Sequence, residues 1–312
     1  MTTPPAGPLG ERADRGERAG RPDRTDRNDR GDAEATTAPV SAERRVAYTE
    51  YGSPDGAPVV FLHGTPGSRL LGGLFDSVAA DAGVRLLAPD RPGYGRSPPW
   101  TGRSVSDGAR IVAAVLDDAG VAEADLLAFS GGAPSAFATA ATRPDRVGRV
   151  EVVAGAPPPG IVDHRPAVQA VLGGLATTTP TLLRGLLGGQ AWLARRLDPS
   201  FVVGQYTTGD PAEAVPERTA AIVREDFLEA FSRSRRGAVT EFRHAADGWD
   251  VDPEAVHAEV RLWHGSDDAN VPIDGARRLA STLPAARLRV IDGADHLQTL
   301  LRAAPAVLRG ES

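Results

Sequence analysis

A serine at position 130 follows a run of apolar residues and precedes two glycines, and these residue types in this order could carry nucleophilic chemistry. The run 124–129 predicts a buried strand, and the glycines allow a tight turn into a helix. Such a turn tolerates only small neighbours two positions away, and Ala128 and Gly132 meet that condition. A serine is a weak nucleophile by itself, so the chemistry requires a base, an acid that orients the base, and donors for an oxyanion.

Polar, glycine-containing segments follow four other apolar runs, and they contain candidates for each of these partners. The carboxyl ends of parallel strands meet at one edge of a sheet, so segments that follow such strands gather in one place. We therefore expect side chains from all of them to lie near Ser130. The segments are 63–68, 90–97, 265–272 and 293–296.

The elements that must position these residues alternate along the chain after about residue 43. Short, continuous apolar runs predict buried strands, and stretches with helical spacing separate them. This alternation is typical of a parallel sheet covered by helices on both faces. The expected strands are 59–62, 84–88, 124–129, 150–153, 260–263 and 288–291, and the expected helices are 70–82, 104–119, 133–142, 275–283 and a closing helix.

The alternation stops between about residues 157 and 252, where the sequence looks helical and is rich in Leu, Ala and Arg. An insertion at the carboxyl edge of a parallel sheet lies where ligands bind, so we expect a helical cap over the site. Structural padding without a role in binding is the alternative. The predicted organisation is a core formed by 43–156 and 253–312, with a cap at 157–252.

The first 42 residues do not look globular. Arginine recurs at every third position from 12 to 30, and an acidic residue precedes each of these arginines except Arg21. Almost nothing in this segment is apolar, so it cannot bury enough surface to offset chain ordering, and we expect a disordered tail. Its charges nearly cancel, which argues against nucleic-acid binding. Removing the tail up to about Val40 is expected to leave activity intact.

The composition excludes several kinds of chemistry. The chain has no cysteine, and all 35 of its basic residues are arginine. This removes disulfides, thiolate nucleophiles, a lysine Schiff base and the lysine of a phosphate-binding loop, although Gly64–Gly67 superficially resembles such a loop. No run is apolar enough for a signal peptide or a membrane span, so we expect a cytoplasmic protein with no membrane partner.

Taken together, the five segments resemble the α/β-hydrolase superfamily from about residue 43 to the end. The order Ser, Asp, His along the chain is the order of that family. The resemblance implies the α/β-hydrolase fold, a mostly parallel, doubly covered sheet with a helical cap inserted after the sixth strand. One departure is Ala128, which stands where the family usually has glycine.

The resemblance also implies a role for each catalytic candidate. Ser130 is the expected nucleophile, and His296, in a Gly-x-Asp-His setting, is the expected base and later acid. Asp268 is the expected orienting carboxylate, because the spacing Gly-x-x-Asp-x-x-Val-Pro from Gly265 selects it over its neighbour Asp267.

The expected oxyanion donors are the backbone N–H groups of Thr65 and of Gly131, the residue after the nucleophile. His63 and Gly64 are expected to set the path of the first loop. Asp90 and the arginine after it are assigned to the scaffold and not to the chemistry. A zinc site at His264 would need partners that the sequence does not identify.

The expected function is hydrolysis of a small-molecule carboxylic ester or lactone through an acyl-enzyme, with no cofactor and no metal ion. A serine nucleophile argues against the dehalogenases and epoxide hydrolases of the superfamily, which use a carboxylate. Three alternatives stay open: a cofactor-free haloperoxidase or perhydrolase, a hydrolase of carbon–carbon bonds in diketones, and a non-catalytic ligand-binding protein on the same fold. The natural substrate and the oligomeric state do not follow from the sequence.

Overall fold

The sheet of this protein begins earlier than the sequence predicts. The structure is a computed structural model that describes residues 1–3, 34–162 and 166–311 of the chain, so most of the predicted tail lies outside the described residues. The predicted end of the tail at residue 42 is wrong, because Thr36–Pro39 forms strand β1. This strand pairs antiparallel with β2 (Arg45–Gly52) and buries Ala38 completely, and that pairing holds residues that look polar and irregular in sequence.

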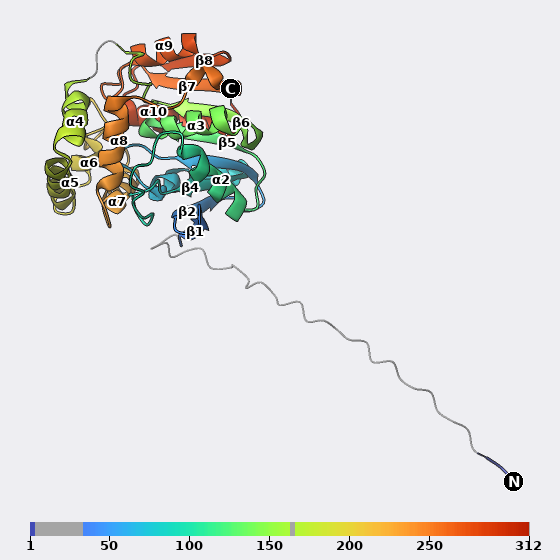
Figure 1. Cartoon of the computed structure of the whole chain (residues 1–312). Coiled ribbons are helices and arrows are strands. Elements are labelled where there is room, and N and C mark those ends of the chain that lie inside the picture. Colours follow the sequence, from blue (N-terminus) through green and yellow to red (C-terminus); the bar gives the residue numbers. More distant parts are fainter. Residues whose placement is uncertain (4–33, 163–165, 312) are drawn as a thin grey trace. The chain divides into compact units, whose positions relative to one another are not determined.

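Among the described residues, eight strands form one sheet in the order β1-β2-β4-β3-β5-β6-β7-β8 (Figure 1). β1 and β2 are antiparallel to their neighbours, and every pair from β4 to β8 is parallel, which confirms the predicted mostly parallel sheet. The remaining strands are β3 (Ala57–Leu62), β4 (Val84–Pro89), β5 (Ala124–Phe129), β6 (Val147–Val153), β7 (Glu259–Gly265) and β8 (Ala286–Ile291).

Alternate residues of the central strands enter two different cores, as the two-residue period of a strand requires. In β5, Leu127 and Phe129 belong to one buried cluster, and Leu126 and Ala128 belong to the other. Helices cover both faces and so produce the continuous apolar runs seen in the sequence. Helices α1 (Asp76–Asp81) and α10 (His296–Leu308) pack on the first cluster, and α2 (Gly108–Asp118), α3 (Ala133–Thr142) and α9 (Ile273–Thr282) pack on the second.

Helices α4 to α8 lie between β6 and β7 in the chain, and we call the residues between these two strands the insertion (Figure 1). Leu187 and Phe227 of the insertion share a buried cluster with Phe129 of the sheet, so the insertion is continuous with one of the two cores. Its helices are α4 (Ala167–Thr178), α5 (Pro180–Ala194), α6 (Ser200–Val203), α7 (Glu217–Ala230) and α8 (Arg236–Asp247).

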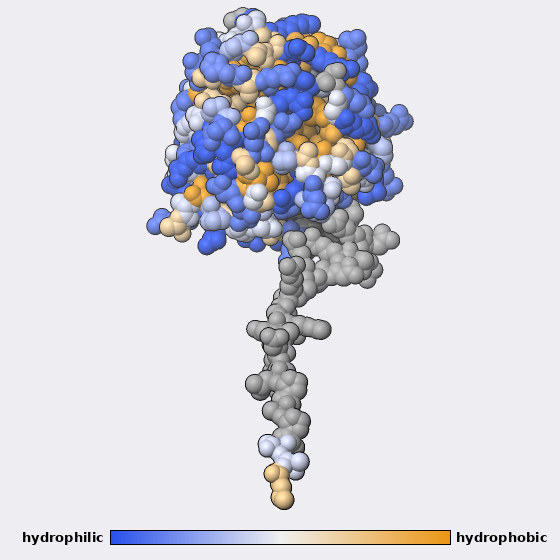
Figure 2. Space-filling model, turned by 90° about the vertical axis from the view of Figure 1, so that its right-hand side faces the viewer, coloured by the Kyte–Doolittle hydropathy of each residue, from blue (hydrophilic) through white to orange (hydrophobic). Residues whose placement is uncertain are grey.

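Hydrophilic side chains cover most of the face shown in Figure 2, and apolar ones lie between them in smaller areas. This face belongs to the side of the sheet that is opposite the insertion in Figure 1. Within the described residues, no helix is both long enough and apolar enough to cross a membrane.

Candidate active site

Ser130 lies at a sharp turn between β5 and α3. Its φ angle is +50°, a left-handed value that is rare for residues other than glycine and that marks backbone strain. A Cβ at Gly132 would lie 2.3 Å from the carbonyl oxygen of Leu62, so only glycine fits there. The close packing of the turn against β3 therefore fixes the position of the serine at the carboxyl edge of the sheet.

Asp268 and His296 are brought together from the ends of β7 and β8. The two Asp268 oxygens have separate tasks: Oδ1 accepts the backbone N–H groups of Asn270 and Val271, at 2.9 and 2.8 Å, and Oδ2 lies 2.7 Å from Nδ1 of His296. Since a carboxylate can only accept, Nδ1 of the imidazole donates and Nε2 is left as an acceptor. This is the tautomer that a general base needs.

The neighbouring groups hold His296 in place. His296 is the first residue of α10, and Asp295 caps this helix by accepting the N–H of Gln298 at 2.8 Å. The ring of Phe129, the residue before the serine, packs against the His296 ring with centroids 4.8 Å apart. Ser130 and His296 therefore both adjoin Phe129, one through the chain and one through ring contact.

The rival carboxylate, Asp267, takes a different position. It is exposed, and its Oδ1 accepts the hydroxyl of Ser266 at 2.8 Å. His264 is buried beside Asp268 instead: its Nε2 donates to the carbonyl of Val271 at 2.7 Å, and burial lowers its pKa, which keeps the ring neutral. In the part of the chain that the structure describes, no group of three His, Cys, Asp or Glu side chains is arranged to hold a metal ion.

The loop after β3 contacts the serine turn directly. A Cβ at Gly131 would lie 2.2 Å from Oγ1 of Thr65. A Cβ at Gly64 would lie 3.5 Å from the Cβ atom of Ser130. The ring of His63 holds this loop in place through two hydrogen bonds. Its Nε2 accepts the N–H of Arg91 at 3.2 Å, so Nδ1 carries the proton and donates to the carbonyl of Gly64 at 2.8 Å.

A buried ion cluster then ties this loop to the insertion. Glu241 of α8 accepts two hydrogen bonds from the fully buried Arg91, both 2.8 Å, and one from Arg103 at 2.6 Å. It also accepts the hydroxyls of Thr65 at 2.5 Å and Tyr94 at 2.9 Å. Burial alone would raise the pKa of Glu241, but the two guanidinium groups hold that pKa well below its usual range.

Arg91 also secures the loop without Glu241. It donates to the carbonyl of Gly64 at 3.0 Å and to that of His63, and its Nη2 lies 3.1 Å from Oγ1 of Thr65. These bonds fit the scaffold role expected for Arg91, but the sequence does not reveal that its ionic partner comes from α8. The signal available in sequence is weak: Glu241 falls on the same helix face as two small residues, Gly237 and Ala238.

A second carboxylate of the insertion binds the same loop in another way. Asp226 of α7 is buried, and its Oδ1 accepts the N–H of Ser68 at 2.6 Å and the Ser68 hydroxyl at 2.8 Å. No described arginine pairs with it. Burial therefore raises the pKa of Asp226 to about 7, against the lowering effect of the two Ser68 bonds.

Asp90, the other expected scaffold residue, is held by Arg69. The Arg69 backbone N–H and guanidinium donate to it at 2.7 and 3.0 Å, and the same guanidinium reaches Glu229 of α7 at 2.5 Å. Gly93, in the loop after β4, contacts helix α8 directly. A Cβ at Gly93 would lie 2.5 Å from the backbone N of Gly237, so the two main chains are in contact.

The insertion also reaches the loops that carry Asp268 and His296. The side chain of Asn270 donates to the carbonyl of Gln205 at 2.9 Å, and the N–H of Leu297 donates to the carbonyl of Tyr206 at 3.1 Å. The Tyr206 ring stacks on the His296 ring at 6.3 Å. All the loops that contain predicted site residues therefore contact the insertion or one another.

Comparison with known proteins places these features in a family. A family model described as alpha/beta hydrolase fold matches residues 57–303. A 2-hydroxy-6-oxononadienedioate/2-hydroxy-6-oxononatrienedioate hydrolase from Burkholderia vietnamiensis is 29% identical over 272 residues, which cover 81% of this chain and 85% of the relative.

Solved structures show the same fold at lower identity. An alpha/beta hydrolase fold protein from Nakamurella multipartita has a TM-score of 0.63 at 24% identity, over 89% of this chain and 100% of that one. The enol-lactonase from Burkholderia xenovorans LB400 has a TM-score of 0.65 at 20% identity, over 88% of this chain and 97% of that one.

Proposed function

Since the chain belongs to the α/β hydrolase fold family, we propose that it is a serine hydrolase that cleaves a small-molecule carboxylic ester or lactone through an acyl-enzyme. The observation that carries this proposal is the 2.7 Å contact of Asp268 with Nδ1 of His296, beside a serine held at φ +50°. An aspartate in this position fixes the imidazole tautomer and stabilises the imidazolium that forms during catalysis.

In the proposed reaction, the hydroxyl oxygen of Ser130 attacks the substrate carbonyl carbon while its proton passes to Nε2 of His296. The N–H groups of Thr65 and Gly131 donate to the oxyanion of the tetrahedral intermediate. The carbon–oxygen bond of the ester then breaks, and the alkoxide leaves with the proton from His296. Water, deprotonated by the same imidazole, releases the acid and restores the serine.

The charges around the site favour an uncharged substrate. The three buried arginines that pack behind the loops, Arg69, Arg91 and Arg103, all have carboxylate partners. A substrate with free carboxylates would have to compete with Glu241 and Asp90 for them, at the cost of breaking buried pairs. A neutral ester or lactone needs no such cation, and this supports it over an anionic substrate.

We further propose that the insertion acts as the cap of this site. Its contacts with the loops of Asp268 and His296 support that role, because substrate selection requires walls that adjoin the reacting groups. The disordered tail and the cytoplasmic location stay predictions from the sequence.

The test is reaction of the purified protein with a fluorophosphonate, followed by peptide mapping, together with turnover of a chromogenic short-chain ester. We expect label on Ser130, none in Ser130→Ala, and a loss of turnover on the order of 10⁴ or more in that variant. Asp268→Asn should lose about 10³–10⁴ in kcat, with Asp267→Asn as its matched control. Full activity in Ser130→Ala, or the reverse ranking of the two Asn variants, contradicts the mechanism.

A carbon–carbon bond hydrolase is the second candidate, and the name of the 29% identical Burkholderia vietnamiensis relative favours it. The same serine would attack a ketone carbonyl, and the leaving group would be a carbanion that His296 protonates. Side-by-side assays of a neutral lactone and a dienedioate ring-fission product distinguish the two, because the paired arginines predict much lower kcat/KM for the dianion.

A further inference from the structure

The large apolar side chains that the described residues expose gather on α4, on α5 and just beyond the end of α5. Seven of nine fall between residues 168 and 197, and the other two are Met1 and Val290. On α5, Leu182, Leu186 and Leu193 recur with helical spacing, so these three form a stripe along that helix. In Figure 1, α4 and α5 lie at the left-hand edge of the fold. We call these seven residues of α4, α5 and the segment just after α5 the apolar face: Val168, Val171, Leu182, Leu186, Trp192, Leu193 and Leu197.

Within residues 167–197 and 230–240, the charged side chains have one sign, and the acids nearest in sequence, Asp198, Glu229 and Glu241, flank these segments. No Asp or Glu occurs at 167–197 or at 230–240, although the whole chain has a net charge of −6. Neither segment contains an arginine that forms an ion pair with a described carboxylate. The arginines are Arg184, Arg195, Arg196, Arg233, Arg235 and Arg236.

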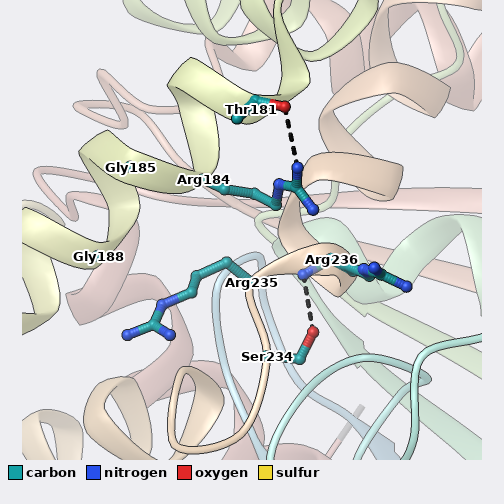
Figure 3. A pocket seen from close by; sticks show the side chains of 7 residues that line it. All are labelled: Thr181, Arg184, Gly185, Gly188, Ser234, Arg235 and Arg236. Carbon is teal, nitrogen blue, oxygen red and sulfur yellow. Dashed lines mark hydrogen bonds between the residues drawn. The ribbon is translucent and has the colours of Figure 1, made fainter.

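Three of these arginines line one open pocket of about 480 Å³ at the border of the apolar face (Figure 3). Arg184 comes from α5, and Arg235 and Arg236 come from the start of α8, where the helix dipole adds positive potential. The Nε–H of Arg235 is buried without a hydrogen-bond partner. The pocket lining contains no carboxylate, and the guanidinium groups of Arg235 and Arg236 extend to opposite sides of it, so they can meet separate anionic groups (Figure 3).

An aromatic residue of the apolar face has one of these arginines on its ring. Trp192 is 52% exposed, and the guanidinium of Arg196 lies 4.0 Å from the centre of its ring. A tryptophan with an arginine on its ring has an apolar body and a charged companion, which suits the boundary between hydrocarbon and headgroups.

We propose that the insertion docks on an anionic lipid surface, with the apolar face in the outer hydrocarbon layer and lipid phosphates at the arginine pocket. A second copy of the chain fits less well. A two-fold interface places the same patch on both sides, and this would bring the six arginines of one copy toward those of the other, with Asp198 as the acid that adjoins the patch. An anionic bilayer supplies both the apolar depth and the negative charge. The prediction of no membrane partner rests on the lack of a run apolar enough for a signal peptide or a membrane span, and docking on a lipid surface requires neither.

The test is co-sedimentation of the full chain with vesicles of phosphatidylcholine alone and with about one third phosphatidylglycerol. We expect binding only to the anionic vesicles, and weaker binding at 0.5 M salt than at 0.05 M, since salt screens the arginines. Leu186→Ser combined with Trp192→Ala should weaken partitioning by about ten-fold or more. Arg235→Gln and Arg236→Gln should each weaken it about five-fold.

Two matched controls keep the test specific. Val290→Ser removes an exposed apolar side chain outside the face, and Arg143→Gln removes an exposed arginine outside the pocket, so both should bind like the parent. Thermal melting confirms that each variant is folded. Equal binding to neutral vesicles, or equal losses in the controls, contradicts the proposal. A dimer in light scattering that Leu186→Ser abolishes, without vesicle binding, overturns it in favour of a self-interface.

Discussion

Glu241 and Asp226 can be compared directly, because each is a carboxylate on an insertion helix that binds the loop after β3; Asp226 is buried and Glu241 is only 10% exposed. Glu241 bonds to Thr65 and has two guanidinium partners, and its pKa lies well below the usual range. Asp226 bonds to Ser68 and has none, and burial raises its pKa to about 7. Glu241 therefore anchors the loop after β3 as a permanent charge, whereas Asp226 anchors it as a group that titrates near neutral pH.

The largest loss of stability is expected at Glu241, whose charge is permanent. Glu241→Gln leaves Arg91 buried without its carboxylate, and an uncompensated buried charge costs about 3–5 kcal/mol of unfolding free energy. Urea unfolding at pH 7 measures this loss. The control is Glu50→Gln, which breaks another two-bond pair, Arg85–Glu50, that is partly exposed and should cost less than about 1 kcal/mol. Equal losses in the two variants would remove the distinction between buried and exposed pairs.

The next effect concerns pH. The folded pKa of Asp226, about 7, exceeds the ordinary value of 3.8, so between these values the folded state keeps a proton that the unfolded state has lost. Stability therefore falls as pH rises through this window. Relative to Asp226→Asn, the parent should lose about 3 kcal/mol of unfolding free energy between pH 5 and pH 8. Urea titrations of both proteins check this, with the exposed Asp81→Asn as a control that keeps the parent's pH dependence. Parallel curves for parent and Asp226→Asn would show that Asp226 ionises normally.

The smallest effect sharpens the same comparison. Ser68→Ala removes a hydroxyl that donates to Asp226 and so favours its ionised form. The variant should lose about 1 kcal/mol at pH 6 and more at pH 8, where the bond is to a charged acceptor. Loss of the hydroxyl raises the folded pKa of Asp226, so the fall in stability should continue to a higher pH than in the parent. An unchanged midpoint in the urea titrations would mean that the backbone N–H of Ser68 alone holds the carboxylate.

The residues after the strands could be predicted because topology alone gathers them. Asp268 and His296 are 28 positions apart, yet they follow β7 and β8, which are neighbours in the sheet. The turn at Ser130 was predictable from residue size, since Ala128 and Gly132 are the small neighbours that it needs.

The anchoring carboxylates could not be predicted, because their partners are remote in sequence. Glu241 is 150 residues from Arg91, and Asp226 is 158 from Ser68. A glutamate on an amphipathic helix most often faces water, and nothing local marks these two as buried. The predicted helix 70–82 was imperfect for a related reason: a 3-10 helix, Arg69–Phe75, replaces its first half, where Gly72 packs directly against the ring of Tyr51 from β2.

Because Gly93 contacts Gly237, α8 and α5 of the insertion differ in how freely their residues can be substituted. A side chain at either position would strike backbone or the Tyr94 ring, so a library that randomises position 237 should return glycine almost alone. The exposed positions of α5 meet no such barrier. Substitutions that alter the binding surface can therefore accumulate on α5. Those at position 237 of α8 are limited by its contact with the loop after β4.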